Sequence, residues 1–503
     1  MTQKTLTTWA LAALCSLGCG AAALAQDSSA LLDALVRKKV LTSQEAEDVR
    51  ADLIKDNAQT NAGKLQLSNS ITSLKLYGDI RLRYQYDDVQ KQLAAAKNDI
   101  HDTQQDRERI RLRLGADFTL NGGFFGGVGL QTAQAADSAN QTVNSSSDSA
   151  AGFGNYNIYI SKAYFGWAND WLTAIGGKQA NPFYTTDLVW DPDINPVGAV
   201  EKIDIIKGFD ALSSNSGDIR SEGPFNLSLV AGQLAFSDNT EANTSVWAGT
   251  KNEATHDNAT DCWLFDTQLI ASAKVASGVK VTVAPGYMTY TNGNTSGVNN
   301  SVSFNSTSGT TTYLASANGT AFSSQRDLSI ITAPGDVSFK VCGLPAKVLW
   351  DFAYNTAGSK RATDVLGLTG VGTTTVKSAN GVSYTYPVAT HSSRDDIAWL
   401  AGAQVGENKK AGDWSVFGNF RQTGIAAVDP NLNDSDFAAG YLNMQGVKAG
   451  VNYSLTDYCV ASVTYFDAWN LRSNVYGGQA TGGNAIAAAN SVQLVQVDLN
   501  LKF

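Results

Sequence analysis

The sequence contains little cysteine, histidine and proline, and it carries no excess of basic residues. Two of the five cysteines fall within the first 25 residues, and the others are Cys262, Cys342 and Cys459. Because these three are far apart, odd in number and free of CxxC spacing, they argue against a disulfide framework or a zinc site. The formal net charge of −9 argues against a general nucleic-acid-binding protein, which would carry a basic excess. No residue pattern calls for a metal ion or a cofactor.

Long apolar runs are also missing. Beyond residue 25, no segment approaches the roughly 18 to 20 uninterrupted apolar residues of a membrane helix. Residues 1–25 have the pattern of a signal peptide, with a short apolar core at Trp9–Leu17 and small residues at Ala23 and Ala25. We expect cleavage before Gln26. Cys19 suggests a lipoprotein as the alternative, but the residues before it form a poor lipidation box.

What the sequence does contain suits many strands joined by polar loops. It has 46 glycines against 9 prolines, with 18 tyrosines, 10 tryptophans and abundant Ser, Thr and Asn. A soluble chain of this length normally divides into several domains, and we find no linker that divides this one. The exported chain is therefore either soluble or a β-barrel, and the composition favours the barrel.

The last residues, from Ser491 to Phe503, alternate strictly between apolar and polar. A period of two is the pattern of a strand whose two faces meet different media. The final strand of bacterial outer-membrane β-barrels is similar, being amphipathic and commonly ending in an aromatic residue that the barrel-assembly machinery recognises. The likeness implies that Phe503 is the contact with this machinery, and that any function lies inside a pore.

The first two expected strands, which begin after about residue 70, carry arginine on one face only. Apolar residues alternate with Arg81 and Arg83 in the first strand, and the second strand repeats the pattern more cleanly. Its arginines are Arg107, Arg109, Arg111 and Arg113. Membrane strands of roughly 9 to 11 tilted residues show this apolar-out, polar-in alternation. Like charges spaced two apart would be costly against lipid, so we expect them to face a watery lumen. The exposed face of a soluble sheet is the alternative.

The connections between strands provide a second test, because outer-membrane barrels alternate short periplasmic turns with long outer loops. Short turns are expected at 121–123, 169–170, 214–223, 277–278, 343–346, 407–412 and 456–457. Long polar loops are expected at 87–106, 135–155, 181–197, 238–261, 291–325, 357–395, 423–438 and 471–490. This alternation predicts an all-β transmembrane antiparallel barrel of about 16 strands over residues 70–503, with both chain ends periplasmic. Counts of 14 or 18 are the alternatives, because Pro334-Gly335 interrupts the pattern and leaves Asp336–Val341 as the expected strand.

Residues 26–69 differ from the rest because their apolar residues recur at helical spacing. Leu31, Leu32 and Leu35 share one face, and Ala46, Val49 and Leu53 share another. Between them, Thr42 and Glu45 form a capping-box pattern. We expect two short amphipathic helices in a periplasmic segment. A loosely ordered or self-associating extension and a tether to a partner are both open.

Several segments resemble the putative porins of Gram-negative bacteria, a family of outer-membrane channels. The matching pieces are LLDALVRKKV with the following LTSQEAEDVR, YGDIRLRYQY, RERIRLRLGA and GGKQANPFYTTDLVWDPDINPVG. The second and fourth are fairly specific, and together with the last strand they extend the resemblance over nearly the whole chain. The family implies passive transport across the outer membrane and identifies no substrate. A homotrimer follows by analogy alone.

The third long loop, Asn181–Val197, holds three of the nine prolines and the carboxylates Asp187, Asp191 and Asp193. In general porins the third loop folds into the barrel, so the resemblance implies an acidic constriction facing the arginine ladder. Such an arrangement would create a transverse field that filters ions and orients dipolar solutes. Asp191-x-Asp193 also fits a calcium ligand pair but lacks further ligands, and solvated loop carboxylates are the plain alternative.

The sequence therefore predicts a porin for small hydrophilic solutes and ions, located in the bilayer of the outer membrane. The main alternative is an outer-membrane adhesin or structural barrel without open-pore conductance. A barrel enzyme is less favoured, because neither GxSxG nor HExxH is present and histidine is scarce. A soluble multi-sandwich protein is the remaining alternative.

Overall fold

The computed structural model divides the chain into two compact units, Met1–Asn69 and Ser70–Phe503. It describes residues 36–38, 40, 42–49, 67–92, 100–132, 138–143, 155–212, 224–237, 261–291, 304–305, 310–311, 326–364, 373–377, 383–387, 390–472 and 488–503. The expected signal peptide, the turn at 214–223 and the loop at 238–261 lie outside these residues, apart from Asp261. Most residues of the loops at 291–325 and 471–490 also lie outside the described residues.

The second unit is a closed antiparallel barrel of 16 strands, as the alternation of turns and loops predicted. In chain order the strands are β1 (Ile71–Gln92), β2 (Ile100–Leu120), β3 (Phe124–Thr132) with β4 (Gln141–Thr142), β5 (Ile158–Ala168), β6 (Leu172–Lys178), β7 (Val197–Asp204), β8 (Phe225–Ser237), β9 (Cys262–Ala276), β10 (Val279–Val283) with β11 (Gly286–Thr291), β14 (Ser329–Thr332) with β15 (Gly335–Val341), β16 (Leu344–Asn355), β19 (Ile397–Gly406), β20 (Trp414–Thr423), β21 (Met444–Ser454), β22 (Cys459–Asn470) and β23 (Ala488–Lys502). Three of the barrel strands consist of two successive segments each, so the 16 barrel strands correspond to 19 segments of the sheet.

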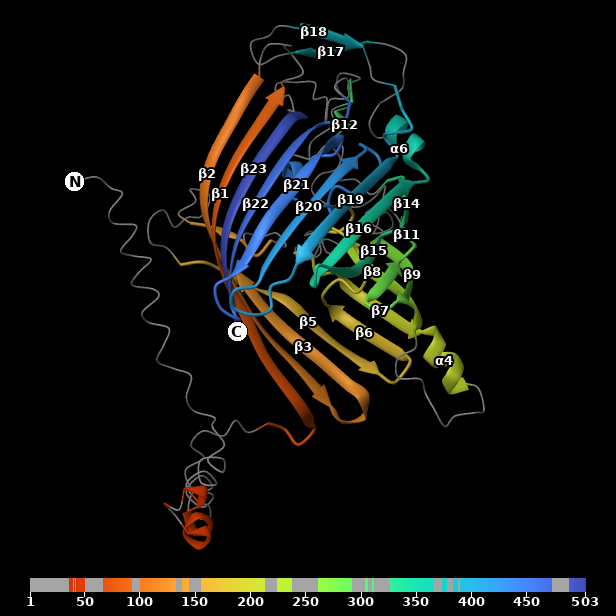
Figure 1. Ribbon diagram of the computed structural model, residues 1–503. Helices are drawn as coiled ribbons and strands as arrows, with labels where there is room; N and C mark the ends of the chain where they lie inside the picture. The colour runs from red at the N-terminus through yellow and green to blue at the C-terminus, as the bar shows by residue number, and fades with distance from the viewer. Residues whose placement is uncertain are drawn as a thin grey trace, which may run out of the picture. The chain divides into compact units, whose positions relative to one another are not determined.

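The barrel closes where the first and last strands meet. β1 lies between β2 and β23 (Figure 1), and Arg83 is opposite Asp498 in the β1–β23 register. At the end of this seam, the Gly78 N–H donates to the Phe503 carbonyl at 2.8 Å, and the Phe503 N–H returns a bond at 3.0 Å. Phe503 is therefore part of the closing ladder.

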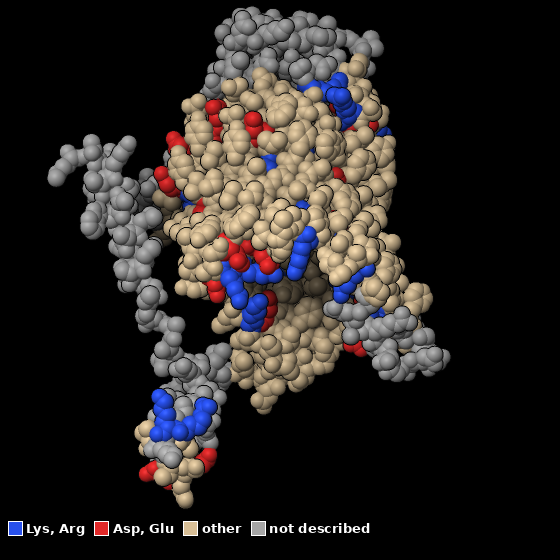
Figure 2. Space-filling view, in the orientation of Figure 1, with Lys and Arg blue, Asp and Glu red and all other residues tan. Residues whose placement is uncertain are grey.

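The period of two corresponds to two faces with different surroundings. On β1, Leu76, Leu82 and Tyr84 are exposed on the outside, whereas Arg83 and Gln85 are buried within the barrel. β23 repeats this, with Val497 exposed and Asp498 buried. The view in Figure 2 shows an outer surface made mostly of uncharged residues. An apolar exterior of this kind is what contact with lipid requires.

Three expected boundaries were wrong. β1 continues to Gln92 and β2 begins at Ile100, so the first loop is shorter than 87–106 because polar residues also pair in the ladder above the apolar band. Before the turn at 214–223, Ile205–Leu212 form helix α4 rather than ending a strand. The strand near Pro334 was expected only from Asp336, but β14 precedes it, and the Pro334 carbonyl still accepts the Ala284 N–H at 2.9 Å.

The remaining described elements are short. They are η2 (Asn121–Gly123), α6 (Gly358–Asp364), η4 (Phe437–Gly440), and the hairpins β12 (Phe304–Asn305) with β13 (Thr310–Thr311) and β17 (Thr373–Lys377) with β18 (Ser383–Pro387).

In the first unit, residues 43–49 form a helix. The predicted capping box is confirmed there, because the Thr42 N–H donates to Glu45 Oε2 at 2.8 Å and the Glu45 N–H donates to Thr42 Oγ1 at 3.2 Å. Of the first expected helical run, only its end is described. None of the described helices has the length and apolarity needed to cross a bilayer.

The tight turn at η2 gives a test of the barrel ladder with a built-in comparison. Gly122 and Gly123 have φ values of +79° and +85°, which cost an L-residue roughly 1–2 kcal/mol. A Cβ on Gly123 would also lie 2.4 Å from the Ala168 carbonyl oxygen, whereas one on Gly122 would have space around it. We expect Gly123→Ala to lower the urea midpoint of the folded barrel clearly more than Gly122→Ala. Equal midpoints would contradict the close approach of the two turns.

Candidate functional site in the barrel lumen

The third long loop, here loop 3 (residues 179–196 between β6 and β7), packs against the inner face of the barrel wall. The Tyr184 N–H donates to Gln268 Oε1 at 2.7 Å, and Gln268 Nε2 donates back to the Tyr184 carbonyl at 2.8 Å. Farther along, Thr186 Oγ1 donates to Asp351 at 2.7 Å. Strands β9 and β16 thus position loop 3 inside the lumen through side chains that point inward.

A second loop also fills the lumen. Loop 7 (residues 424–443 between β20 and β21) is mostly buried, including the apolar run Ile425–Val428. This run packs with Leu188, Val189 and Trp190 of loop 3 in one hydrophobic cluster. The same cluster includes inward-facing residues of the wall, such as Leu264 and Leu400. Apolar packing between the two loops and the wall therefore fills part of the lumen on this side.

Direct hydrogen bonds join the two loops. The Asp191 N–H donates to the Leu432 carbonyl at 2.5 Å, and the Asp191 carboxylate accepts the Ser435 N–H at 3.1 Å and its hydroxyl at 3.0 Å. The Asp434 N–H donates to the Asp187 carbonyl at 3.3 Å. Loops 3 and 7 consequently form a single rigid partition.

A cluster of four charges anchors this partition to strands β20 and β21. Asp187 lies 2.7 Å from Arg421 and 2.5 Å from Lys448, and Asp434 lies 3.3 Å and 3.7 Å from the same two groups. Arg421 is almost fully buried, with a side chain only 2% exposed. Two carboxylates thus balance two cations where a single unpaired charge would be costly.

Opposite the apolar side, the arginines of β1 and β2 form a ladder along the inner wall. Four of the six have carboxylate partners within 3.5 Å. Arg111 and Arg113 share Asp79, at 2.8 Å and 2.6 Å. Arg107 pairs with Asp87 at 2.5 Å, and Arg83 pairs with Asp498 at 2.7 Å and with Asp436 of loop 7 at 3.4 Å. Carboxylates on the barrel strands therefore neutralise most of the paired arginines of the ladder.

The other two arginines bind amides. Arg81 donates to Asn140 Oδ1, and Arg109 donates to Gln85 Oε1 at 3.2 Å. The nearest carboxylate paired with Arg81 is Asp498, at 4.0 Å, and that group already binds Arg83. Among the described residues, these two guanidinium groups are thus the least neutralised members of the ladder.

Two cavities lie along the ladder, and both are lined by Pro192 and Asp193 of loop 3. The first, of about 370 Å³, is also lined by Arg81 and Arg109. The second, of about 430 Å³, is lined by Arg113 and reaches Phe503 at the end of the barrel. Loop 3 thus contributes to the walls of both cavities beside the arginine ladder.

Residues 21–503 match the sequence family described as "Putative porin". The chain belongs to the putative porin family. A closed barrel with exposed apolar residues agrees with this assignment, and the family and the fold together support an outer-membrane porin.

Several solved structures are similar to this porin at low sequence identity. The Salmonella typhi OmpF complex with daunomycin is 10% identical, with a TM-score of 0.42 and coverage of 87% of this chain and 100% of that one. Pseudomonas putida OprB at high pH is 10% identical, with a TM-score of 0.42 and coverage of 86% and 94%. A triple mutant of Rhodopseudomonas blastica porin is 10% identical, with a TM-score of 0.38 and coverage of 86% and 100%. No curated protein matches the sequence.

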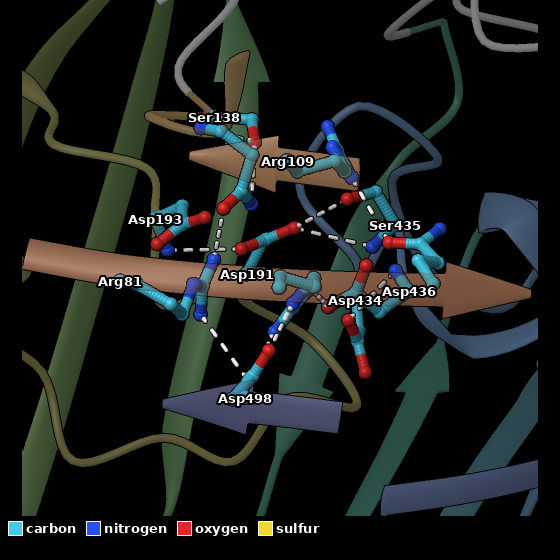
Figure 3. A network of polar contacts seen from close by, with 12 residues as sticks. Arg81, Arg109, Ser138, Asp191, Asp193, Asp434, Ser435, Asp436 and Asp498 are labelled. Atoms are coloured by element: carbon cyan, nitrogen blue, oxygen red, sulfur yellow. Dashed lines mark hydrogen bonds and ion pairs between the residues drawn. The ribbon is translucent and has the colours of Figure 1, made fainter. Parts of the chain in front are cut away.

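The three loop carboxylates of this porin lie in different surroundings, and Figure 3 shows two of them, Asp191 and Asp193. Asp193 approaches the ladder, with its carboxylate 4.0 Å from Arg113. Asp191 accepts hydrogen bonds from Ser435 of loop 7, and Asp187 pairs with Arg421 and Lys448 rather than with the ladder. Among the described residues, no group of three or more His, Cys, Asp or Glu could hold a metal ion.

Sequence reasoning missed several lumen residues of the porin. Loop 7 contributes Asp434 and Asp436 to the first cavity, and the strands contribute Asp79, Asp87 and Asp498 to the ladder. The strand carboxylates share the parity of the arginines, so the alternation in the sequence contained their signal. For loop 7, the signal was the apolar run Ile425–Val428 inside a supposedly polar loop.

Proposed function

We propose that this porin forms a water-filled channel through which small hydrophilic solutes and ions diffuse passively. The observation that carries the proposal is the pair of cavities along the arginine wall, beneath an inward-folded loop 3. A barrel of this strand number is wide enough to leave an aqueous lumen. Diffusion through such a lumen needs neither energy coupling nor a covalent step.

The lumen would filter solutes by charge. Cations of β1 and β2 line one side of the path, and carboxylates of loops 3 and 7 line the other. Fixed charges of opposite sign across a narrow aqueous passage produce a transverse field, which turns dipolar solutes and discriminates between ions. Arg81, Arg109 and Asp193 are the groups that we expect a permeating solute to meet.

The same proposal covers the cellular setting of the channel. Residues 1–25 would be removed as a signal peptide, residues 26–69 and the C-terminus would lie in the periplasm, and Phe503 would be read by the barrel-assembly machinery. A homotrimer is the expected assembly. These expectations rest on the sequence and on the family, and none of them alters the lumen described above.

Single-channel recording in a planar bilayer tests the function directly. We expect stepwise conductance roughly linear in salt concentration. Persistent silence, with the folded protein demonstrated in the membrane, would contradict a diffusion channel and favour an adhesin or structural barrel.

Asp193 offers a test of the filter. A unit charge about 4 Å from a permeating ion contributes about 1 kcal/mol in a watery lumen, which corresponds to about fivefold in relative permeability. Asp193→Asn is therefore expected to lower the cation-to-anion permeability ratio by up to about fivefold, measured as a reversal-potential shift under a salt gradient. The control is Asp170→Asn in the exposed turn between β5 and β6, which makes the same change outside the lumen. An unchanged reversal potential for Asp193→Asn would remove this residue from the filter.

A further inference from the structure

The two amide-bound arginines share one cavity. Arg81 and Arg109 both line the 370 Å³ space, and neither has a carboxylate partner within 3.5 Å, because the Asp498 carboxylate is 4.0 Å from Arg81. Their positions are diagonal in the β1–β2 register, where Arg83 is opposite Arg109 and Arg81 is opposite Arg111. Two partly uncompensated cations thus face the same small volume.

The remaining charges of this cavity can be sorted by their partners. Its lining holds the cations Arg81, Arg107, Arg109 and Lys448, and the carboxylates Asp87, Asp187, Asp191, Asp193, Asp434 and Asp436. Arg107 is paired with Asp87, and Lys448 with Asp187. Asp434 is paired with Arg421, and Asp436 with Arg83. Four charged side chains of the cavity remain without a close partner of opposite charge. They are Arg81 and Arg109 on the wall and Asp191 and Asp193 on loop 3.

These two carboxylates have no close cationic partner. Asp191 accepts hydrogen bonds from neutral donors only, the N–H groups of Asp193 and Ser435 and the Ser435 hydroxyl, and Asp193 lies 4.0 Å from Arg113. Figure 3 shows Asp191 and Asp193 beside Arg81, with Arg109 in the same network. The cavity therefore offers two positive groups and two negative groups that have no partner of opposite charge within 3.5 Å.

We propose that this cavity is a binding site for small zwitterionic solutes that carry one carboxylate and one ammonium group, as amino acids do. The carboxylate would bind between Arg81 and Arg109, and the ammonium would face Asp191 and Asp193. The inference rests on the proposed channel function and adds a solute class to it. Transport remains passive, and the site makes it saturable.

Other classes of solute fit the charges less well. A simple carboxylate would be attracted by the arginines but repelled by Asp191 and Asp193. A simple amine would be attracted by Asp191 and Asp193 but repelled by the arginines. A neutral sugar would form hydrogen bonds without the charge-assisted gain that both ends of a zwitterion receive. The opposed pairs thus select for a dipole rather than for a net charge.

Three probes with one skeleton separate these classes. β-Alanine carries both groups, propionate carries only the carboxylate, and 3-amino-1-propanol carries only the ammonium. We expect β-alanine, added to full-length channels conducting KCl, to reduce the current saturably at a lower half-saturating concentration than either other probe. An equal effect of propionate, or of the amine, would overturn the zwitterion site.

Variants locate the site. Arg109→Gln is expected to raise the half-saturating β-alanine concentration by about tenfold, because it removes a charged hydrogen-bond donor. Arg107→Gln removes the same charge from the same cavity at a carboxylate-paired position, and a markedly smaller rise is expected. Lys409→Gln, in an exposed turn, controls for the loss of one positive charge. Equal rises for all three variants would contradict a local site.

The outcomes distinguish the inference from the function on which it depends. Wild-type channels that conduct KCl but respond to β-alanine no more than to propionate would overturn the inference alone. Channels with no conductance would overturn both. The comparison of probes on the wild-type protein requires no variant to fold.

Discussion

Asp187→Asn is expected to destabilise the barrel by about 3–5 kcal/mol, because it breaks a buried ion pair and leaves a buried cation without its partner. The substitution removes one of two carboxylates that balance Arg421 and Lys448, and Arg421 is nearly inaccessible to water. We also expect larger and noisier single-channel currents, since loop 3 loses its anchor to β20 and β21. Urea unfolding of the detergent-solubilised barrel measures the first effect, and planar-bilayer recording measures the second.

A second substitution tests the charge-balance explanation. Adding Lys448→Gln to Asp187→Asn leaves Arg421 paired with Asp434, so the cluster is neutral again. We expect this double variant to recover a large part of the lost stability. Asp170→Asn, at an exposed turn, controls for the loss of one carboxylate and should leave the urea midpoint unchanged. A double variant less stable than Asp187→Asn alone would rule out charge balance as the cause.

Trp190→Ala is expected to cost about 3–5 kcal/mol, the range for truncating a buried aromatic residue. Trp190 is 2% exposed and belongs to the apolar cluster that joins loops 3 and 7. Its ring centroid lies 6.4 Å from that of Phe183, so the substitution also removes an aromatic contact within loop 3. The same urea unfolding measures the loss, and a rise in conductance would accompany it as the partition loosens.

Trp414 provides the matched control for this prediction. It lies on β20 with 43% of its surface exposed, on the outward face of the barrel. Trp414→Ala therefore removes the same side chain without opening a cavity in the packed partition, and a smaller loss of stability is expected. If both variants unfolded at the same urea concentration, the apolar packing of loops 3 and 7 would not be a main source of stability.

The sequence predicted the features of the barrel that follow from local physical rules. A strand between lipid and water must alternate, so the parity of Arg83 and Leu82 followed from their positions alone. Turns such as that at Gly122 and Gly123 were recognisable because their residue types tolerate positive φ. The strand near Pro334 was less clear, because its continuation depends on a hydrogen bond from a distant part of the chain. The Pro334 carbonyl accepts the Ala284 N–H.

Pairing over long distances in the chain was beyond local rules. The alternation placed the arginines on one face but gave no reason to expect that Asp79 serves two of them while Arg81 binds an amide. Loop 3 was located by its prolines and by resemblance, whereas loop 7 was placed among the polar loops. Its apolar run packs in one cluster with loop 3 and with the barrel wall, and the linear sequence places neither beside it.

The bonds between Asp191 and Ser435 also set the order of events during assembly. These residues are separated by 244 positions, and the two loops can meet only when strands from both halves of the chain have come together. Contacts of such high sequence separation are entropically expensive to form early. The barrel wall must therefore be largely in place before the lumen acquires its final width. We therefore expect the narrowing of the channel by loops 3 and 7 to be among the last steps of its folding.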